Sequence, residues 1–164
     1  MPGPAVSELL KTSLIEVRDV VHSGPSAGMG EWECASRTQL AFVYRGTFLR
    51  HVDGEAVVAD ASQVLFFNAG EPYRISRPHP GGDAGLVFEV DEAMLREIAP
   101  ADLIHEDAPL RFRMQRLRID PRAQVLVALL RHSLREGVAD SLEGESLALT
   151  LVQRSIGPRT AHAA

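Results

Sequence analysis

The chain has 164 residues, of which 45% are hydrophobic and 24% charged, and a formal net charge of −5. This length supports one compact domain. The acidic balance argues against a chain that binds nucleic acid by itself, because phosphate binding needs a basic face. The single cysteine, Cys34, excludes an internal disulfide and a zinc site built from several thiolates. No apolar run approaches the ~20 residues needed to cross a membrane, and residues 1–20 lack the pattern of a secretory signal. We therefore expect a cytoplasmic protein with no membrane partner.

The central part of the chain, from Arg37 to about Val90, has the pattern of an all-β domain. Short runs rich in Val, Leu, Phe and Tyr alternate with turn signals, of which Asp53-Gly54 is the clearest because both residues tolerate the positive φ of a two-residue hairpin. The pattern predicts strands over residues 39–44, 47–52, 55–59, 64–67, 73–76 and 86–90. Evenly spaced short strands of this kind favour a sandwich or a barrel.

The period changes after Val90. Asp91 is expected to cap a short helix that ends near Ala99-Pro100, and residues 111–118 are expected to add one more strand. Two longer helices follow: Asp120-Pro121 begins one that reaches Gly137, and Asp140 with Glu143 forms a capping box for one that ends at Gly157-Pro158. The sequence thus predicts a mainly β protein with C-terminal helices. We expect a barrel over residues 1–118, a helical hairpin over 119–157 and a linker or tail over 158–164.

Two segments, RGTFLRHVDG at residues 45–54 and FFNAGEPY at residues 66–73, resemble the cupin superfamily. In particular, they resemble the amino-terminal sensor domain of AraC-type transcriptional regulators, and the resemblance extends over roughly residues 14–157. It implies a cupin-like double-stranded β-helix, or jelly-roll barrel. It also implies a domain that binds a small effector and forms a homodimer.

The resemblance also places the ligand positions of metal-binding cupins, at Trp32, Cys34, Gln39 and Tyr73. An indole cannot ligate a metal, and an amide or a phenol binds a divalent ion poorly, which leaves Cys34 as a credible ligand. We therefore expect no metal and no other cofactor. The same four side chains are still expected to point into the barrel, where aromatic faces with a few polar tips make a small-molecule pocket. Two readings stay open: Trp32 as filled core, and Cys34 as an inert thiol.

Two further residues are candidates for this pocket. Arg50 faces inward if Phe48 and Val52 do, and it then needs an anionic partner or a ligand carboxylate; the opposite register leaves it at the surface. Phe88 is expected beside the pocket, on the same face of its strand as Leu86. Aromatic walls with one possible cation favour a small, partly apolar and anionic compound over a sugar.

The functional prediction is therefore an effector-binding and dimerisation domain of an AraC-type regulator that contains no catalytic residues. The helical hairpin is the expected dimer surface, although its leucines could instead pack on the barrel. DNA would be reached only through a C-terminal helix-turn-helix domain, which these residues do not supply. Two alternatives remain: a small cupin enzyme acting as an isomerase, epimerase or dioxygenase, and a binding module without a ligand. A helix-turn-helix downstream in the reading frame would separate the regulator from the enzyme.

Overall fold

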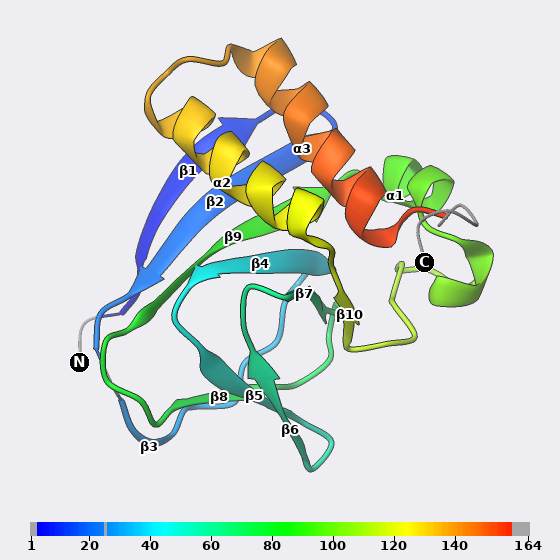
Figure 1. The fold of residues 1–164 in the computed structure, drawn as a ribbon. Helices are drawn as coiled ribbons and strands as arrows, with labels where there is room; N and C mark the ends of the chain where they lie inside the picture. Colours follow the sequence, from blue (N-terminus) through cyan, green and yellow to red (C-terminus); the bar gives the residue numbers. More distant parts are fainter. Residues whose placement is uncertain (1–2, 25, 159–164) are drawn as a thin grey trace.

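The computed structural model describes residues 3–24 and 26–158, which form two facing antiparallel sheets and three α-helices (Figure 1). The larger sheet has the order β1 (Ala5–Lys11), β2 (Ile15–His22), β9 (Asp83–Val90), β4 (Gln39–Arg45), β7 (Gln63–Phe67) and β10 (Arg116–Arg118). The smaller sheet has the order β3 (Ser26–Met29), β8 (Arg74–Arg77), β5 (Phe48–Val52) and β6 (Glu55–Ala59).

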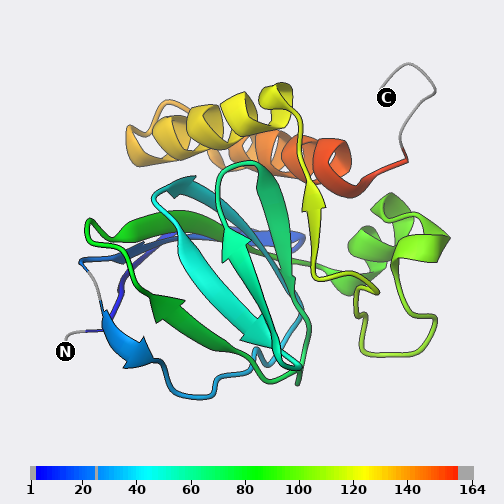
Figure 2. The ribbon, with the colours of Figure 1, turned by 60° about the horizontal axis from the view of Figure 1, so that its bottom comes forward.

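The chain crosses between the two sheets six times, from β2 to β3, β3 to β4, β4 to β5, β6 to β7, β7 to β8 and β8 to β9 (Figure 2). This is the predicted double-stranded β-helix, or jelly roll. Its crossings are tight. Gly46, between β4 and β5, has φ +72°, and a Cβ there would collide with the carbonyl oxygen of Gly82, between β8 and β9. Gly82 also has φ +72°, and a Cβ there would collide with the carbonyl oxygen of His22, so glycine is required at both corners.

The hairpin predicted at Asp53-Gly54 is confirmed. Both residues have positive φ, +48° and +79°, as a two-residue turn between antiparallel strands requires. The turn fixes the register in which Val52 pairs with Glu55 and Phe48 with Ala59.

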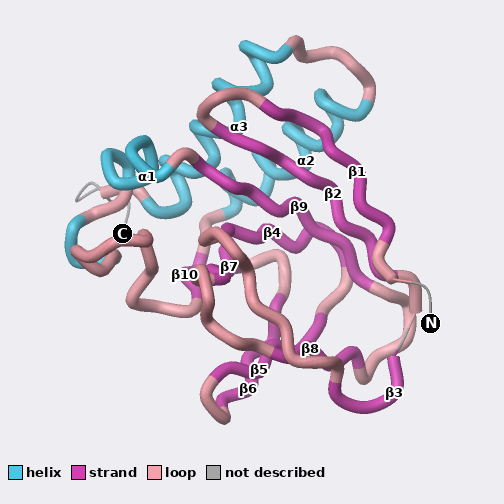
Figure 3. Tube along the Cα trace, turned by 180° about the vertical axis from the view of Figure 1, so that it is seen from behind, coloured by secondary structure: helices cyan, strands magenta, loops and turns pink. Residues whose placement is uncertain are grey.

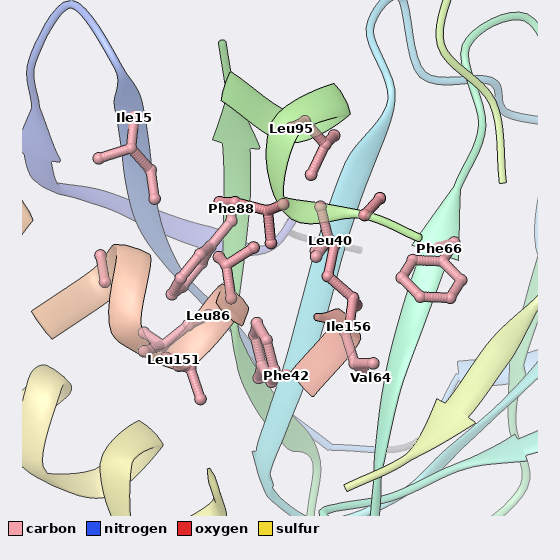
Figure 4. Close-up of a cluster of buried hydrophobic side chains, with 14 of the residues drawn as sticks. Ile15, Leu40, Phe42, Val64, Phe66, Leu86, Phe88, Leu95, Leu151 and Ile156 are labelled. Carbon is pink, nitrogen blue, oxygen red and sulfur yellow. The ribbon is translucent and has the colours of Figure 1, made fainter. Parts of the chain in front are cut away.

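The middle strands of the larger sheet are buried on both faces. Successive side chains of a strand point to opposite faces. One set, which faces the helices, is completely buried and includes Leu40, Phe42, Val64, Phe66, Leu86 and Phe88 (Figure 4). The other set faces the smaller sheet and includes Ala41, Val43, Leu65, Phe67 and Val87. The larger of the two cores therefore lies outside the jelly roll, between sheet and helices.

All three predicted helix starts are confirmed. Aspartate carboxylates cap α1 (Glu92–Ile98), α2 (Pro121–Arg135) and α3 (Ser141–Ile156), each by accepting a backbone N–H of the first turn. These aspartates are Asp91, Asp120 and Asp140. A short 3-10 helix, Ala101–Leu103, follows α1.

Helices α2 and α3 lie across the outer face of the larger sheet, as the view from behind shows (Figure 3). The residues that they bury against it include Val127, Leu130, Ala148, Leu151, Val152 and Ile156. The interpretation in which leucines of the second helix pack on the barrel is therefore correct for Leu149 and Leu151, whereas Leu142 is exposed. Within the described residues no helix is long and apolar enough to span a membrane.

Sequence patterns missed three strands, β1, β2 and β3. They also predicted one strand over residues 111–118, of which β10 is only the last part. The loop before β10 is instead held by Asn68, which is buried and makes two hydrogen bonds to the backbone of Phe112. Most of the predicted tail, residues 159–164, lies outside the described residues; Pro158 follows α3.

A buried carboxylate joins the sheet to helix α2. Asp19 on β2 has no exposed side-chain surface. Its Oδ1 accepts the hydroxyl of Tyr44 at 2.6 Å, and its Oδ2 lies 3.1 Å from Arg131 Nε and 2.8 Å from Arg135 Nη2. The Arg131 guanidinium also lies 4.4 Å from the centre of the Tyr44 ring. Four polar side chains thus satisfy one another across the joint.

We expect Asp19→Asn to lower the free energy of unfolding by about 3 kcal/mol, because the substitution removes the one buried charge that compensates both arginines. Glu16→Gln on the same strand is the control; it removes a partly exposed carboxylate 3.7 Å from Arg18 and should cost less than about 1 kcal/mol. Urea denaturation measures both, and equal losses would contradict the role of the cluster.

Candidate functional site

A cavity of about 230 Å³ lies inside the jelly roll, between the two sheets. It is lined by residues from β2, β4, β5, β7, β8 and β9, by Pro4 ahead of β1 and by Glu33 in the segment between β3 and β4. Its middle is apolar, with walls from Ala41, Val43, Phe48, Phe67, Ile75 and Val87. Phe67 packs edge-on against Tyr73, with ring centres 4.8 Å apart. Both ends carry polar side chains, the arrangement expected of a small-molecule site.

The polar group at the corner end consists of His22, Arg77 and Asp83, which flank the crossings β2–β3 and β8–β9. Arg77 Nε lies 2.7 Å from Asp83 Oδ2, and both side chains are largely buried. The Arg77 guanidinium also lies 5.6 Å from the centre of the Phe48 ring. Burial, and next the nearby Arg77 charge, lower the pKa of His22, so the imidazole is neutral at pH 7.

The opposite end of the cavity is formed by Glu33, Gln39 and Tyr73. Glu33 and Tyr73 exchange backbone hydrogen bonds, which bring the β3–β4 segment across this end. Gln39 Nε2 donates to Glu89 at 2.9 Å, which fixes the amide. Burial raises the pKa of the Tyr73 hydroxyl to about 12, so it is a neutral hydrogen-bonding group. The structure thus brings the predicted Gln39 and Tyr73 together in the cavity wall.

Arg50 faces inward, the first of the two registers left open by the sequence, because Phe48, Arg50 and Val52 are all buried. Its guanidinium is not among the cavity-lining groups. It donates to the backbone carbonyls of Phe66 at 2.6 Å and Gln115 at 2.7 Å, and it lies 4.8 Å from the centre of the Phe67 ring. Burial lowers its pKa to about 10. Backbone carbonyls thus take the place of the expected anionic partner, and Arg50 ties β5 to β7 and to the residue before β10.

The prediction that Trp32 and Cys34 point into the barrel is wrong. Both side chains are exposed, Trp32 by 62%, and neither lines the cavity. The reading of Trp32 as filled core is also wrong, since its ring instead covers the Arg74 guanidinium at 5.2 Å. The reason is that residues 32 and 34 lie outside the regular strands, where the alternation that directs side chains inward does not apply.

The prediction that Phe88 lines the cavity also needs correction. Phe88 does share a face with Leu86, but that face packs under the helices, 5.0 Å from Phe42 between ring centres. Val87 and Gly85 point toward the cavity instead. The strand was predicted correctly but the face was not. The more apolar face of β9, with Leu86 and Phe88, packs under the helices, and the face with Asp83, Gly85 and Val87 lines the cavity.

Sequence reasoning missed His22, Glu33, Arg77 and Asp83. His22 was missed together with strand β2. Arg77 and Asp83 lie on either side of the Gly81-Gly82 turn, which is visible in the sequence. This turn was therefore the available signal for polar residues at the cavity. Among residues 3–24 and 26–158, no group of three His, Cys, Asp or Glu side chains is arranged to hold a metal. The absence of a metal stays a prediction.

A larger hollow, of about 440 Å³, lies near the turn between β1 and β2 and the start of α1. Two of its polar side chains hold neighbouring loops: Glu92 accepts hydrogen bonds from the Leu110 N–H and from Arg96, and the Thr38 hydroxyl donates to the Leu110 carbonyl. The interior cavity, with its aromatic walls and polar ends, is therefore the candidate site.

We expect His22→Gln to reduce the acid sensitivity of the fold. Because the folded pKa of His22 is lowered, protonation favours the unfolded chain, so its contribution to stability is present above about pH 6.5 and is lost as the pH falls through the lower folded pKa. Unfolding free energies at about pH 5 and pH 7.5 should differ less in this variant than in the native chain. His79→Gln, at an exposed position, should leave the difference unchanged. An unchanged difference in His22→Gln would contradict the assignment.

Comparison with solved structures finds several chains that are similar to this one at low identity. They include a cupin superfamily protein from Desulfitobacterium hafniense (13% identity, 53% of this chain and 76% of that chain covered, TM-score 0.44). Another is KdgF from Halomonas sp. (15% identity, 56% and 82% covered, TM-score 0.46). A third is the cupin domain of Schizosaccharomyces pombe Cnp3 (10% identity, 59% and 72% covered, TM-score 0.47).

No curated protein sequence shows a significant match to this chain. The model of one protein family, described as the AraC-binding-like domain, matches residues 19–156. That range begins within β2 and ends at the last residue of α3, so it includes strands β3 to β10 and the three α-helices. The chain therefore belongs to the AraC-binding-like domain family.

Proposed function

We propose that this chain is the effector-binding and dimerisation domain of an AraC-type transcriptional regulator. In this proposal the chain binds a small molecule without converting it, and DNA is contacted by a separate helix-turn-helix unit. The observation that carries the proposal is the cavity inside the jelly roll, which combines an apolar middle with polar groups at both ends. Membership in the AraC-binding-like family supports the regulatory setting.

The architecture suggests how binding would be communicated. Strands β2, β4 and β9 line the cavity with one face and hold helices α2 and α3 with the other. On β2, Val20 and His22 face the cavity while Asp19 binds Arg131 and Arg135 of α2. A ligand would shift the helices only to the extent that it binds their alternative arrangements with different affinity.

The cavity can be tested by filling it. We expect a small molecule that raises the Tm of the native chain to lose this effect in Val87→Phe, because the larger side chain occupies the cavity. Val58→Phe is the matched control; Val58 is 48% exposed on β6 and does not line the cavity. A thermal-shift screen of small organic compounds provides the ligand. If Val87→Phe retains the full shift, binding occurs elsewhere and the proposed site is wrong.

The proposed dimer surface is the outer face of α2 and α3. Val125 and Leu129 stand four residues apart on α2, so they share one face, and both are exposed, by 65% and 45%. Leu142 at the start of α3 is 75% exposed. Apolar side chains in such a row are costly in water, and a second copy of the same face would cover them symmetrically.

We expect the native chain to be a dimer and Val125→Glu/Leu129→Glu to be a monomer, because opposing glutamates in a symmetric contact would repel each other and lose their water. Val58→Glu, on β6 at the far side of the molecule, should leave the dimer intact (Figure 1). Light scattering coupled to gel filtration measures the masses. A monomeric native chain, or a dimer in both variants, would refute this surface.

A further inference from the structure

Arg77 is the one cation among the described residues that line the cavity. Its guanidinium is fixed twice, by Asp83 on its Nε side at 2.7 Å and by the ring of Phe48 at 5.6 Å. An arginine held by a carboxylate at Nε can present its terminal nitrogens as a fork, which matches the two oxygens of a carboxylate. Its position at the corner end would place a bound anion against one end of the apolar walls.

We propose that the effector of this domain is a small apolar monocarboxylate whose carboxylate binds Arg77. This inference rests on the proposed function of the cavity. The size of the site limits the rest of the ligand: about 230 Å³ is below the roughly 300–1,000 Å³ of pockets for drug-sized ligands, which favours a single ring or a short alkyl chain. Such a group would contact Ala41, Phe67 and Val87 in the middle of the cavity.

The other charges around the cavity are compatible with an anion. Asp83 pairs with Arg77 through Nε, so the charges of these two side chains offset each other, and an anion would be held by the terminal N–H groups of Arg77. Glu33 lies at the opposite end and is exposed, so water screens its charge. His22 beside Arg77 is neutral at pH 7 and can donate or accept a hydrogen bond. An amine at the corner end would meet Asp83, whose carboxylate already pairs with Arg77.

A matched set of probes tests this assignment on the full chain. Four skeletons (phenyl, benzyl, cyclohexyl and pentyl) are each supplied as the carboxylate, the primary amide and the aminomethyl compound, and dissociation constants are measured by ligand-observed NMR at about pH 7.5. We expect at least one carboxylate to bind at least about tenfold more tightly than its amide and its amine, because charge-assisted bidentate hydrogen bonds are the stronger ones.

Variants of the chain assign the effect to Arg77. Arg77→Gln should weaken carboxylate binding by about tenfold and leave amide binding unchanged. Because that change strands the Asp83 charge, Arg77→Gln/Asp83→Asn provides a neutral pair that should fold and show the same loss. Arg74→Gln is the control; Arg74 lies on the same strand but outside the cavity, and the carboxylate preference should persist.

The outcomes separate this inference from the proposed function. Amides or amines that bind as tightly as the carboxylates would overturn the carboxylate assignment and leave the cavity as a small-molecule site. A carboxylate preference that survives both Arg77 variants would move the anion site elsewhere and overturn the role of Arg77. If no member of the set binds, the inference fails, and the proposed function is judged by the response of Val87→Phe.

Discussion

The burial of one sheet on both faces is the constraint on which the rest of the structure depends. Strands β4, β7 and β9 bury apolar side chains on each side, because one side packs under α2 and α3 and the other faces the smaller sheet. The helix-facing side is filled with large side chains such as Phe42 and Phe88. The inner side carries smaller ones, such as Ala41, Val43 and Gly85, and the cavity exists where these leave space. Because most of the large apolar side chains are buried between the sheet and the helices, the space between the two sheets is not completely filled.

Two arginines between the sheets, Arg50 and Arg77, have different roles. The terminal nitrogens of Arg50 donate hydrogen bonds to the backbone carbonyls of Phe66 on β7 and of Gln115, so the protein itself solvates this buried charge. Arg77 bonds Asp83 through Nε at the corner end of the cavity. Both guanidiniums also lie over aromatic rings, Phe67 and Phe48, that belong to the cavity wall. The first arrangement fixes the distance between the sheets, and the second supplies charge to the space between them.

Helix caps and the hairpin turn were predicted correctly from the sequence, because each depends on interactions between residues close together in the chain. Caps at Asp91, Asp120 and Asp140 and the turn at Asp53-Gly54 were predictable because each is satisfied within a few residues. The direction of Phe88 was not predictable from its strand alone. Alternation shows that Phe88 shares the more apolar face of β9 with Leu86, but only the packing of the helices shows that this face lies outside the jelly roll. The prediction for Trp32 failed for a different reason. It assumed that residue 32 lies in a regular strand, whereas Trp32 lies between β3 and β4. Gln39 succeeded because it begins a regular strand, and Arg77 was missed because corners bring together residues that are distant in sequence.

The contacts of Asp19 with helix α2 also depend on strands that are buried on both faces. Asp19 and Val20 are neighbours on β2, yet one binds the arginines of α2 and the other lines the cavity. Tyr44 at the end of β4 reaches the same carboxylate, while Val43 beside it faces the cavity. The buried Asp19 carboxylate therefore links two strands of the cavity wall, β2 and β4, to helix α2. The same helix carries the exposed Val125 and Leu129 on its outer face, so one element connects the cavity wall with that surface.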